Sequence, residues 1–202
     1  MKKIISILFL FPCFFSFSQV ALKIMHVRPT GTMGMIFKPT ITGEIFYKGF
    51  DDKSNWQPRF GLGFIKCTPR LDTFQVAGYI VSQTTTVSPG YMSYQKYNIF
   101  YLYGGIDYKI KLFKSFFMYP GFDFNFGFTS VEYQAAYPLI SSEGYSGGSA
   151  YIGMRLRTGC EYQIKERAAI FIEATRNMNL IPHEAFFAYN DYGLGFRYNF
   201  SK

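Results

Sequence analysis

A strict two-residue alternation near the C-terminus constrains this chain more than any other feature. Tyr192, Leu194, Phe196, Tyr198 and Phe200 alternate with Gly193, Gly195, Arg197 and Asn199. Successive side chains of a β-strand point to opposite faces, so this segment predicts a strand with one aromatic face and one small or polar face. The segment after Met118 repeats the pattern, with Phe122, Phe124, Phe126 and Phe128 separated by glycine or polar residues.

The composition agrees with strands that separate lipid from a polar interior. Aromatic residues make up 21% of the chain, whereas charged residues make up 17%, below the roughly 25% of soluble domains. The mean hydropathy of +0.02 is too low for a helical membrane protein. One such strand could also face the core of a soluble sandwich, but the recurrence of the pattern in the same sense favours a membrane barrel.

We predict an all-β fold, an eight-stranded antiparallel transmembrane β-barrel with a polar, plugged interior. The expected strands cover 32–48, 58–66, 73–84, 96–111, 116–132, 149–164, 168–177 and 191–200. Tight turns at 112–115 and 165–167 alternate with longer connections at 85–95, 134–148 and 179–190. This alternation places the tight turns and both chain ends in the periplasm and the long connections outside. The connections at 49–57 and 67–72 are similar in length, and no strand is assigned to 19–30.

The N-terminal segment predicts export. A short basic start, Met1-Lys2-Lys3, precedes an apolar run from Ile4 to Phe15 and then Ser16-Phe17-Ser18, which suits cleavage before Gln19. We therefore expect a signal peptide at 1–18 and a barrel domain at 19–202. A retained signal anchor is the alternative, although the apolar run is shorter than the roughly 20 residues that span a bilayer. Removal of the two lysines lowers the net charge from +8 to +6.

The chain resembles the small eight-stranded bacterial outer-membrane β-barrel superfamily, including its outer membrane protein beta-barrel and PorT-like families. The resemblance lies in the end of the predicted signal peptide, in the strands that alternate glycine with aromatic residues, and in the terminal strand 193–200. The resemblance implies the outer membrane of a Gram-negative-type bacterium and a link to protein secretion. It also implies that Phe200 belongs to the signal read by the barrel assembly machinery, although Ser201 and Lys202 follow it. The expected partners are outer-membrane lipid, this machinery and other envelope proteins. No nucleic acid is expected, because the basic residues form no compact run.

An eight-stranded barrel has room inside for little more than side chains. Alternation directs a mixed set of charges inward: Lys38, Glu44, Lys48, Arg59, Asp107, Lys109, Lys111, Asp123, Arg155, Arg157, Glu161, Glu173 and Arg197. Buried charges must be paired, so we predict an interior polar network that plugs the barrel. A path for ions or solutes lined by arginine and lysine is the alternative.

No catalytic, cofactor or metal motif stands out. His183 lies beside Glu184 in the last outer connection, where Ser141, Ser142 or Ser146 could meet it, but a solvated loop histidine explains it as well. His26 is expected in the periplasm without a partner. Cys67 and Cys160 are expected to be free thiols, with Cys160 on the lipid face. Five tyrosines are assigned to an interfacial girdle: Tyr91, Tyr94, Tyr97, Tyr101 and Tyr103.

Three functions are compatible with these features. The first is a non-enzymatic structural or accessory subunit that acts through its outer loops or barrel wall. The second is a narrow channel or transporter for small or apolar solutes, similar to OmpW-like barrels. The third is a lipid-modifying enzyme centred on His183, which would need a hydroxyl within about 2.6–3.2 Å of that histidine.

Overall fold

A computed structural model describes residues 18–49, 54–80, 87–137, 140–180 and 188–200. Ten strands and one short helix make up this part of the chain. They are β1 (Ser18–Pro29), α2 (Gly31–Ile36), β2 (Thr40–Gly49), β3 (Trp56–Lys66), β4 (Phe74–Ile80), β5 (Val87–Tyr108), β6 (Ile110–Phe113), β7 (Phe116–Tyr137), β8 (Ile140–Lys165), β9 (Ala168–Asn179) and β10 (Tyr189–Asn199). The expected signal peptide falls outside these residues except for Ser18, so it stays a prediction.

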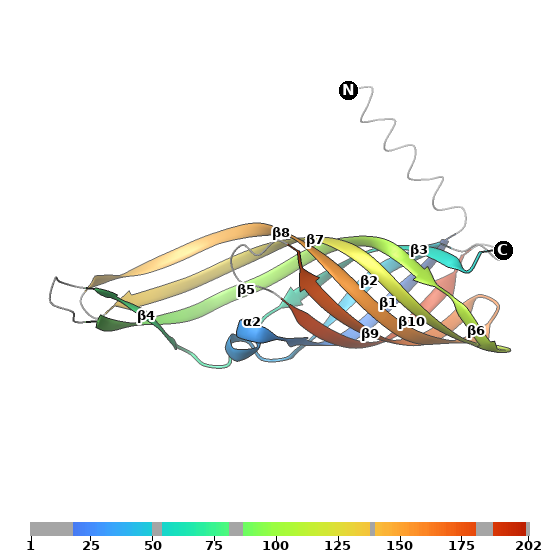
Figure 1. Cartoon of the computed structure of the whole chain (residues 1–202), viewed down its shortest axis with the longest axis horizontal. Coiled ribbons are helices and arrows are strands. Elements are labelled where there is room, and N and C mark those ends of the chain that lie inside the picture. The colour runs from blue at the N-terminus through green and yellow to red at the C-terminus, as the bar shows by residue number, and fades with distance from the viewer. Residues whose placement is uncertain (1–17, 50–53, 81–86, 138–139, 181–187, 201–202) are drawn as a thin grey trace, which may run out of the picture.

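Eight of the strands close into an antiparallel barrel, as predicted. The hydrogen-bonded order runs β5-β3-β2-β1-β10-β9-β8-β7, and a further pairing between β5 and β7 closes the ring. Closure leaves the ring itself without a free edge, which is one of the few ways a sheet can cross a membrane. Figure 1 shows the closed part of the molecule at the right, with β6 at its outer end and β4 far to the left, beyond the barrel.

Two of the eight predicted strands were wrong in detail. Residues 18–29, to which no strand was assigned, form β1, which pairs with both β2 and β10. The expected strand 32–48 is instead α2 followed by β2 from Thr40. The expected strand 73–84 corresponds to β4, which pairs only with β5 and lies outside the ring. The predicted number of eight barrel strands was therefore right, but two of the segments predicted to form them were wrong.

Both described chain ends lie at the same end of the barrel, which we call the base. Gln19 is paired with Asn199, so the first and last barrel strands begin and finish side by side. The tight connections between Phe113 and Phe116 and between Lys165 and Ala168 are also at the base. The opposite end, which carries α2, is called the distal end. The even number of strands accounts for this arrangement, and the periplasmic position of the base stays a prediction.

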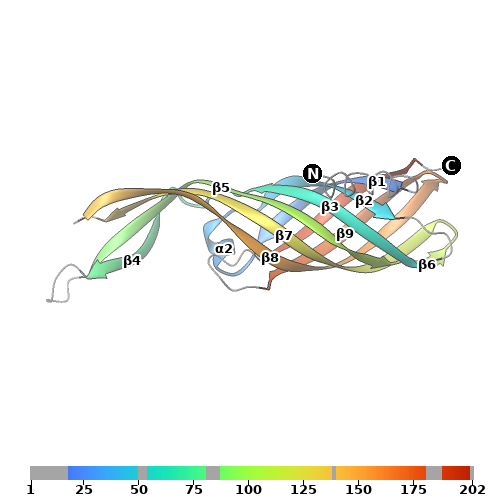
Figure 2. The ribbon, with the colours of Figure 1, turned by 90° about the horizontal axis from the view of Figure 1, so that it is seen from above.

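Three ring strands continue far beyond the barrel at the distal end. β5, β7 and β8 lengthen into a sheet to which β4 adds a fourth strand (Figures 1 and 2). We call this the projecting sheet; it comprises β4 with residues 87–98, 130–137 and 140–152. The connections expected at 85–95 and 134–148 therefore consist mostly of strand. Their many serines and glycines were mistaken for loop signals, although a sheet in contact with water accepts them on either face.

The outer wall of the barrel is apolar. Leu22, Ile172 and Leu194 expose 58%, 59% and 61% of their surface, and the phenylalanines of β7 line the same wall. Contiguous apolar surface of this extent is rare on proteins that face water and matches a lipid-facing band. Within the described residues, no helix is long and apolar enough to cross a membrane.

The interior beneath the distal end is also apolar. Met33 of α2 and Phe37 are buried, and the Phe37 ring lies 4.9 Å from that of Tyr97. The segment after β3 holds α2 in place, because the guanidinium of Arg70 donates from Nε to the carbonyl oxygen of Gly34 at 2.8 Å. The backbone nitrogen of Arg70 also donates to the carbonyl of Ile36. Met33 and Phe37 thus fill part of the barrel interior below the distal end.

Candidate functional site: the charged interior

The middle of the barrel is occupied by charged side chains. Among the residues that the structure describes, twelve charged residues are buried, six basic and six acidic: Lys23, Lys48, Arg59, Arg155, Arg157 and Arg197 against Glu44, Asp107, Asp123, Glu161, Glu173 and Asp191. The formal charges of this set cancel. Burial of an unpaired ion costs several kcal/mol, so this balance is what a closed interior requires.

Lys23 of β1 is the centre of the group of charges on the distal side of this network, which we call the upper cluster. Its Nζ lies 2.9 Å from Glu44 Oε2, 3.0 Å from Glu173 Oε1 and 2.9 Å from Asp191 Oδ1. The ammonium therefore meets an acid from each of β2, β9 and β10, so it ties its two neighbouring strands to a third. Arg155 reaches the same site from β8, with Nη2 2.6 Å from Glu44 Oε1.

A lower cluster continues the network toward the base. Asp107 accepts from Arg157 Nη2 at 2.5 Å and pairs with Lys48 Nζ at 3.0 Å. Arg157 also pairs with Asp123 and lies 3.8 Å from Glu173, which links the two clusters. Further down, Glu161 pairs with Arg197 at 2.5 Å and with the half-buried Lys109 at 3.7 Å.

Inward tyrosines complete the network, and two glycines make room for them. Tyr101 donates from its hydroxyl to Glu44 Oε1 at 2.6 Å. Its ring lies over Gly63 of the neighbouring strand, and that of Tyr103 lies over Gly61 in the same way. A side chain at either glycine would collide with the ring. Tyr97, Tyr101 and Tyr103 are thus buried in the barrel, and their assignment to an interfacial girdle was wrong.

The structure brings together eleven of the thirteen charged residues proposed for the polar network. The residues that face the interior are Glu44, Lys48, Arg59, Asp107, Lys109, Asp123, Arg155, Arg157, Glu161, Glu173 and Arg197. Lys38 was wrong, because it follows α2 on the distal surface and is exposed. Lys111 is also exposed, at the base. Sequence reasoning missed Lys23, because no strand was assigned there, and Asp191, which alternation with Tyr192 would have directed inward.

These contacts can hold charge in place, but they position no nucleophile beside a base. The described residues contain no group of histidine, cysteine and acidic side chains that could hold a metal ion. His183 lies outside the described residues. His26 is exposed on the outer wall near the distal end, away from the base that is predicted to face the periplasm, so its own predicted periplasmic position disagrees with that orientation. Cys67 and Cys160 are free.

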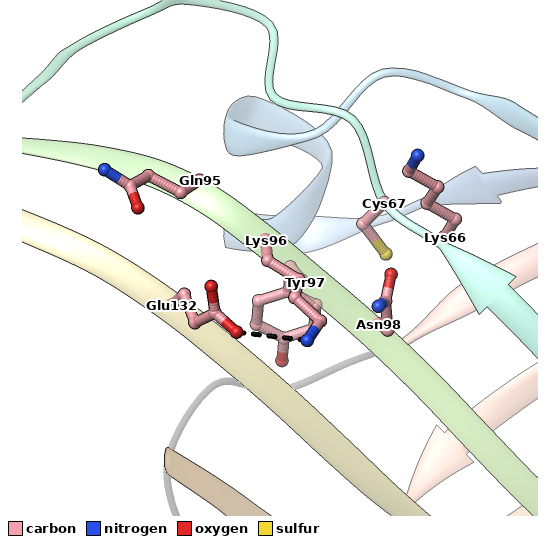
Figure 3. Close-up of a pocket in the computed structure, with 7 residues that line it drawn as sticks. All are labelled: Lys66, Cys67, Gln95, Lys96, Tyr97, Asn98 and Glu132. Atoms are coloured by element: carbon pink, nitrogen blue, oxygen red, sulfur yellow. Dashed lines mark hydrogen bonds and ion pairs between the residues drawn. The ribbon is translucent and has the colours of Figure 1, made fainter. Parts of the chain in front are cut away.

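A hollow of about 340 Å³ lies on the distal wall where β3 leaves β5 (Figure 3). Lys96 and Glu132 form an ion pair of 3.0 Å along one side, and Lys66, Cys67 and Asn98 lie along the other. Burial raises the pKa of the Cys67 thiol to about 12, so this thiol stays protonated at neutral pH. A protonated, buried thiol is a poor nucleophile.

No protein-family model and no curated protein sequence matches this chain. Solved structures resemble it in fold. Neisserial surface protein A gives a TM-score of 0.59 at 11% identity, over 91% of this chain and 97% of its own. A major outer membrane protein from Thermus thermophilus gives 0.56 at 13% identity, over 91% and 99%.

This protein is an eight-stranded β-barrel with the fold of small bacterial outer-membrane proteins. The exposed apolar wall requires a lipid bilayer, and the fold places the barrel in the outer membrane. The predicted barrel fold and its outer-membrane localisation are confirmed, and membership of the predicted superfamily stays a prediction. Identities of 11% and 13% carry no function across, and the narrower resemblance to PorT-like barrels stays a prediction.

Proposed function

We propose that this barrel is a non-enzymatic structural or accessory protein of the outer membrane that binds a partner through its projecting sheet. The observation that carries the proposal is a row of aromatic rings across that sheet, one from each strand. Phe74 of β4 lies 6.1 Å from Tyr94 of β5, which lies 5.9 Å from Tyr133 of β7. Tyr133 stacks on Tyr145 of β8 at 5.0 Å.

The row suits a binding surface. Tyr145 exposes 50% of its surface at the end of the row, and its neighbours along β8 are mostly serine and glycine. Tyrosine supplies a large, rigid and amphipathic contact at low entropic cost, and serine and glycine supply adaptable hydrogen bonds. The sheet begins where the lipid-facing phenylalanines of β7 stop, after Phe128, so it lies in water rather than in lipid. Resemblance to PorT-like barrels adds the proposal that the partner belongs to a protein-secretion apparatus.

The channel alternative is less well supported. The charges at mid-height are paired with one another, and the buried side chains of Met33 and Phe37 fill part of the interior below the distal end. A transporter would need these pairs to part during each cycle. The enzyme alternative needs a geometry around His183, which lies outside the described residues, and nothing in the described residues favours it.

Partner binding is tested with the double variant Tyr133→Ser/Tyr145→Ser. Tyr91→Ser is the matched control, because Tyr91 is exposed on the opposite face of the same sheet. The readout is the set of envelope proteins that co-purify with the folded barrel in mild detergent, measured by quantitative mass spectrometry. Wild type and control should retain a common partner that the double variant loses. An unchanged set of proteins with the double variant would contradict the proposal.

A further inference from the structure

The outer wall of β1 and β9 changes from apolar to basic at one level near the distal end. On β1 the exposed Ile24 is followed on the same face by His26 and Arg28. On β9 the exposed Ile172 is followed, four residues further along the same face, by Arg176. Arg28 therefore follows the apolar, lipid-facing part of β1, and Arg176 interrupts that of β9, where the exposed Leu180 lies beyond it. We place both arginines at the level of the lipid headgroups near the distal end.

The sheet register places the two arginines in one row. Arg28 is opposite Asn190 of β10, and Asn190 is opposite Arg176. Neighbouring strands are about 4.8 Å apart, so the two arginine Cα atoms are about 10 Å apart and their long side chains can reach one group between them. Arg176 already points along the row, because its Nη1 donates to Asn190 Oδ1 at 2.9 Å and to Thr30 Oγ1 at 3.4 Å.

Among the described residues, no acid on the outer wall of β1, β9 or β10 neutralises this row, because the outward-facing positions of these strands include neither aspartate nor glutamate. The nearby acids Glu173 and Asp191 point to the interior, where Lys23 pairs with both. The row therefore presents two guanidinium groups to the bilayer surface, and guanidinium binds phosphate through paired hydrogen bonds.

We propose that Arg28, Asn190 and Arg176 bind the phosphate headgroup of an anionic lipid in the leaflet at the distal end. The acyl chains of that lipid would lie against Ile24, Ile172 and the neighbouring apolar wall. Tyr192, exposed directly below Asn190 on β10, lies at the boundary between headgroup and acyl chains, where tyrosine is favoured. The site is independent of the partner surface on the projecting sheet.

The site also accounts for the irregular sequence of β1. Up to Ile24 the lipid-facing residues are apolar and the interior position holds Lys23, but beyond it the outward residues become basic and the interior residues become Met25 and Val27. The outward face has left the acyl region at this point. At the same level along β1, the barrel interior below α2 is apolar, because Met25 and Val27 face it.

The test uses the full chain purified in detergent, with lipid binding measured by native mass spectrometry. The probes are phosphatidic acid, phosphatidylcholine and diacylglycerol with identical acyl chains. Wild type should prefer phosphatidic acid. A basic residue near an anionic surface contributes about fivefold in affinity, so each of Arg28→Gln and Arg176→Gln should weaken binding about fivefold and the double variant about 30-fold. Lys165→Gln/Arg167→Gln, exposed at the base, is the matched control and should bind as wild type does.

Several results would overturn the proposal. One is a double variant, folded by heat-modifiable gel migration, that binds phosphatidic acid as tightly as wild type. Another is an equal loss in the control at the base, which would indicate only a general charge effect. Equal binding of diacylglycerol would show that the phosphate is not recognised. Inorganic phosphate at millimolar concentration should displace little lipid, because it lacks acyl chains; complete displacement would indicate a site for free phosphate instead.

Discussion

Replacing Glu173 by glutamine should destabilise the barrel more than any comparable surface change. Glu173 Oε1 lies 3.0 Å from Lys23 Nζ and 3.2 Å from Arg59 Nη2, and Oε2 contacts Arg59 Nη1. Lys23 would keep two other acids at 2.9 Å, whereas Arg59 would keep one acid, Glu44 at 3.7 Å, besides the Tyr103 hydroxyl at 3.3 Å. The cost therefore comes mainly from one buried guanidinium left without a close carboxylate.

Removal of one partner from a buried ion pair costs about 3–5 kcal/mol, and the remaining contacts of Lys23 place this variant at the lower end. We expect the free energy of unfolding to fall by about 3 kcal/mol, which is roughly a 150-fold change in the equilibrium constant. The assay is urea unfolding in lipid vesicles, followed by the fluorescence of Trp56, which is the only tryptophan of the chain. Trp56 lies against Tyr108, 4.8 Å between rings, so its emission should respond to strand separation.

Glu166→Gln is the matched control, because it is the same chemical change at an exposed position in the turn before β9. It should alter stability by less than about 0.5 kcal/mol. Arg59→Met combined with Glu173→Gln should recover part of the loss, because the uncompensated charge is then removed. A loss below about 1 kcal/mol for Glu173→Gln, or no recovery in the double variant, would refute the view that paired charges hold the interior.

Three further changes probe other parts of the structure. Gly63→Val should displace the Tyr101 ring and cost about 1–3 kcal/mol in the same assay, whereas Gly144→Val, which meets nothing nearby, should not. Equal losses would contradict the close packing. Cys67 should react with a hydrophilic maleimide only after unfolding, because its thiol is buried and its pKa is about 12; rapid labelling of the folded barrel would refute this. Phe200→Asp should lower the fraction of heat-modifiable barrel in membranes, and normal assembly would remove its proposed role as a signal.

Alternation predicted the direction of side chains wherever a strand lies between lipid and the charged middle of the barrel. Arg155 and Arg157 on β8, and Glu173 on β9, follow this pattern without interruption, so their inward positions were visible in the sequence. The pattern depends on two different environments on the two faces. It therefore holds only over the part of each strand that crosses the lipid.

β1 was missed because both of its environments change along its length. Lys23 and Ile24 follow the rule, but Met25, His26 and Arg28 reverse it, as the interior becomes apolar and the outside becomes polar. Over the whole segment the two faces then have similar average polarity, and no period of two is visible. Because this strand was not predicted, Lys23, whose ammonium is central to the interior network, was not predicted either.

Pairing partners were the other feature that sequence could not provide. Phe74 begins a good strand pattern, but nothing local says that this strand joins the projecting sheet instead of the ring. In the same way, the serines and glycines between Ser146 and Ser149 are typical of loops when taken alone. They form a strand because β7 continues beside them, residue for residue. Such partnerships between distant segments are set by the closed sheet as a whole.

Single-channel recording of the purified full chain in planar bilayers tests the plugged interior most directly. Among the described residues, six buried basic and six buried acidic side chains pair across the lumen, and Met33 and Phe37 are buried in it below the distal end. A lumen filled in this way predicts no stable conductance above that of the bilayer alone. Large, steady openings would contradict it, because they require a continuous aqueous path through the paired charges.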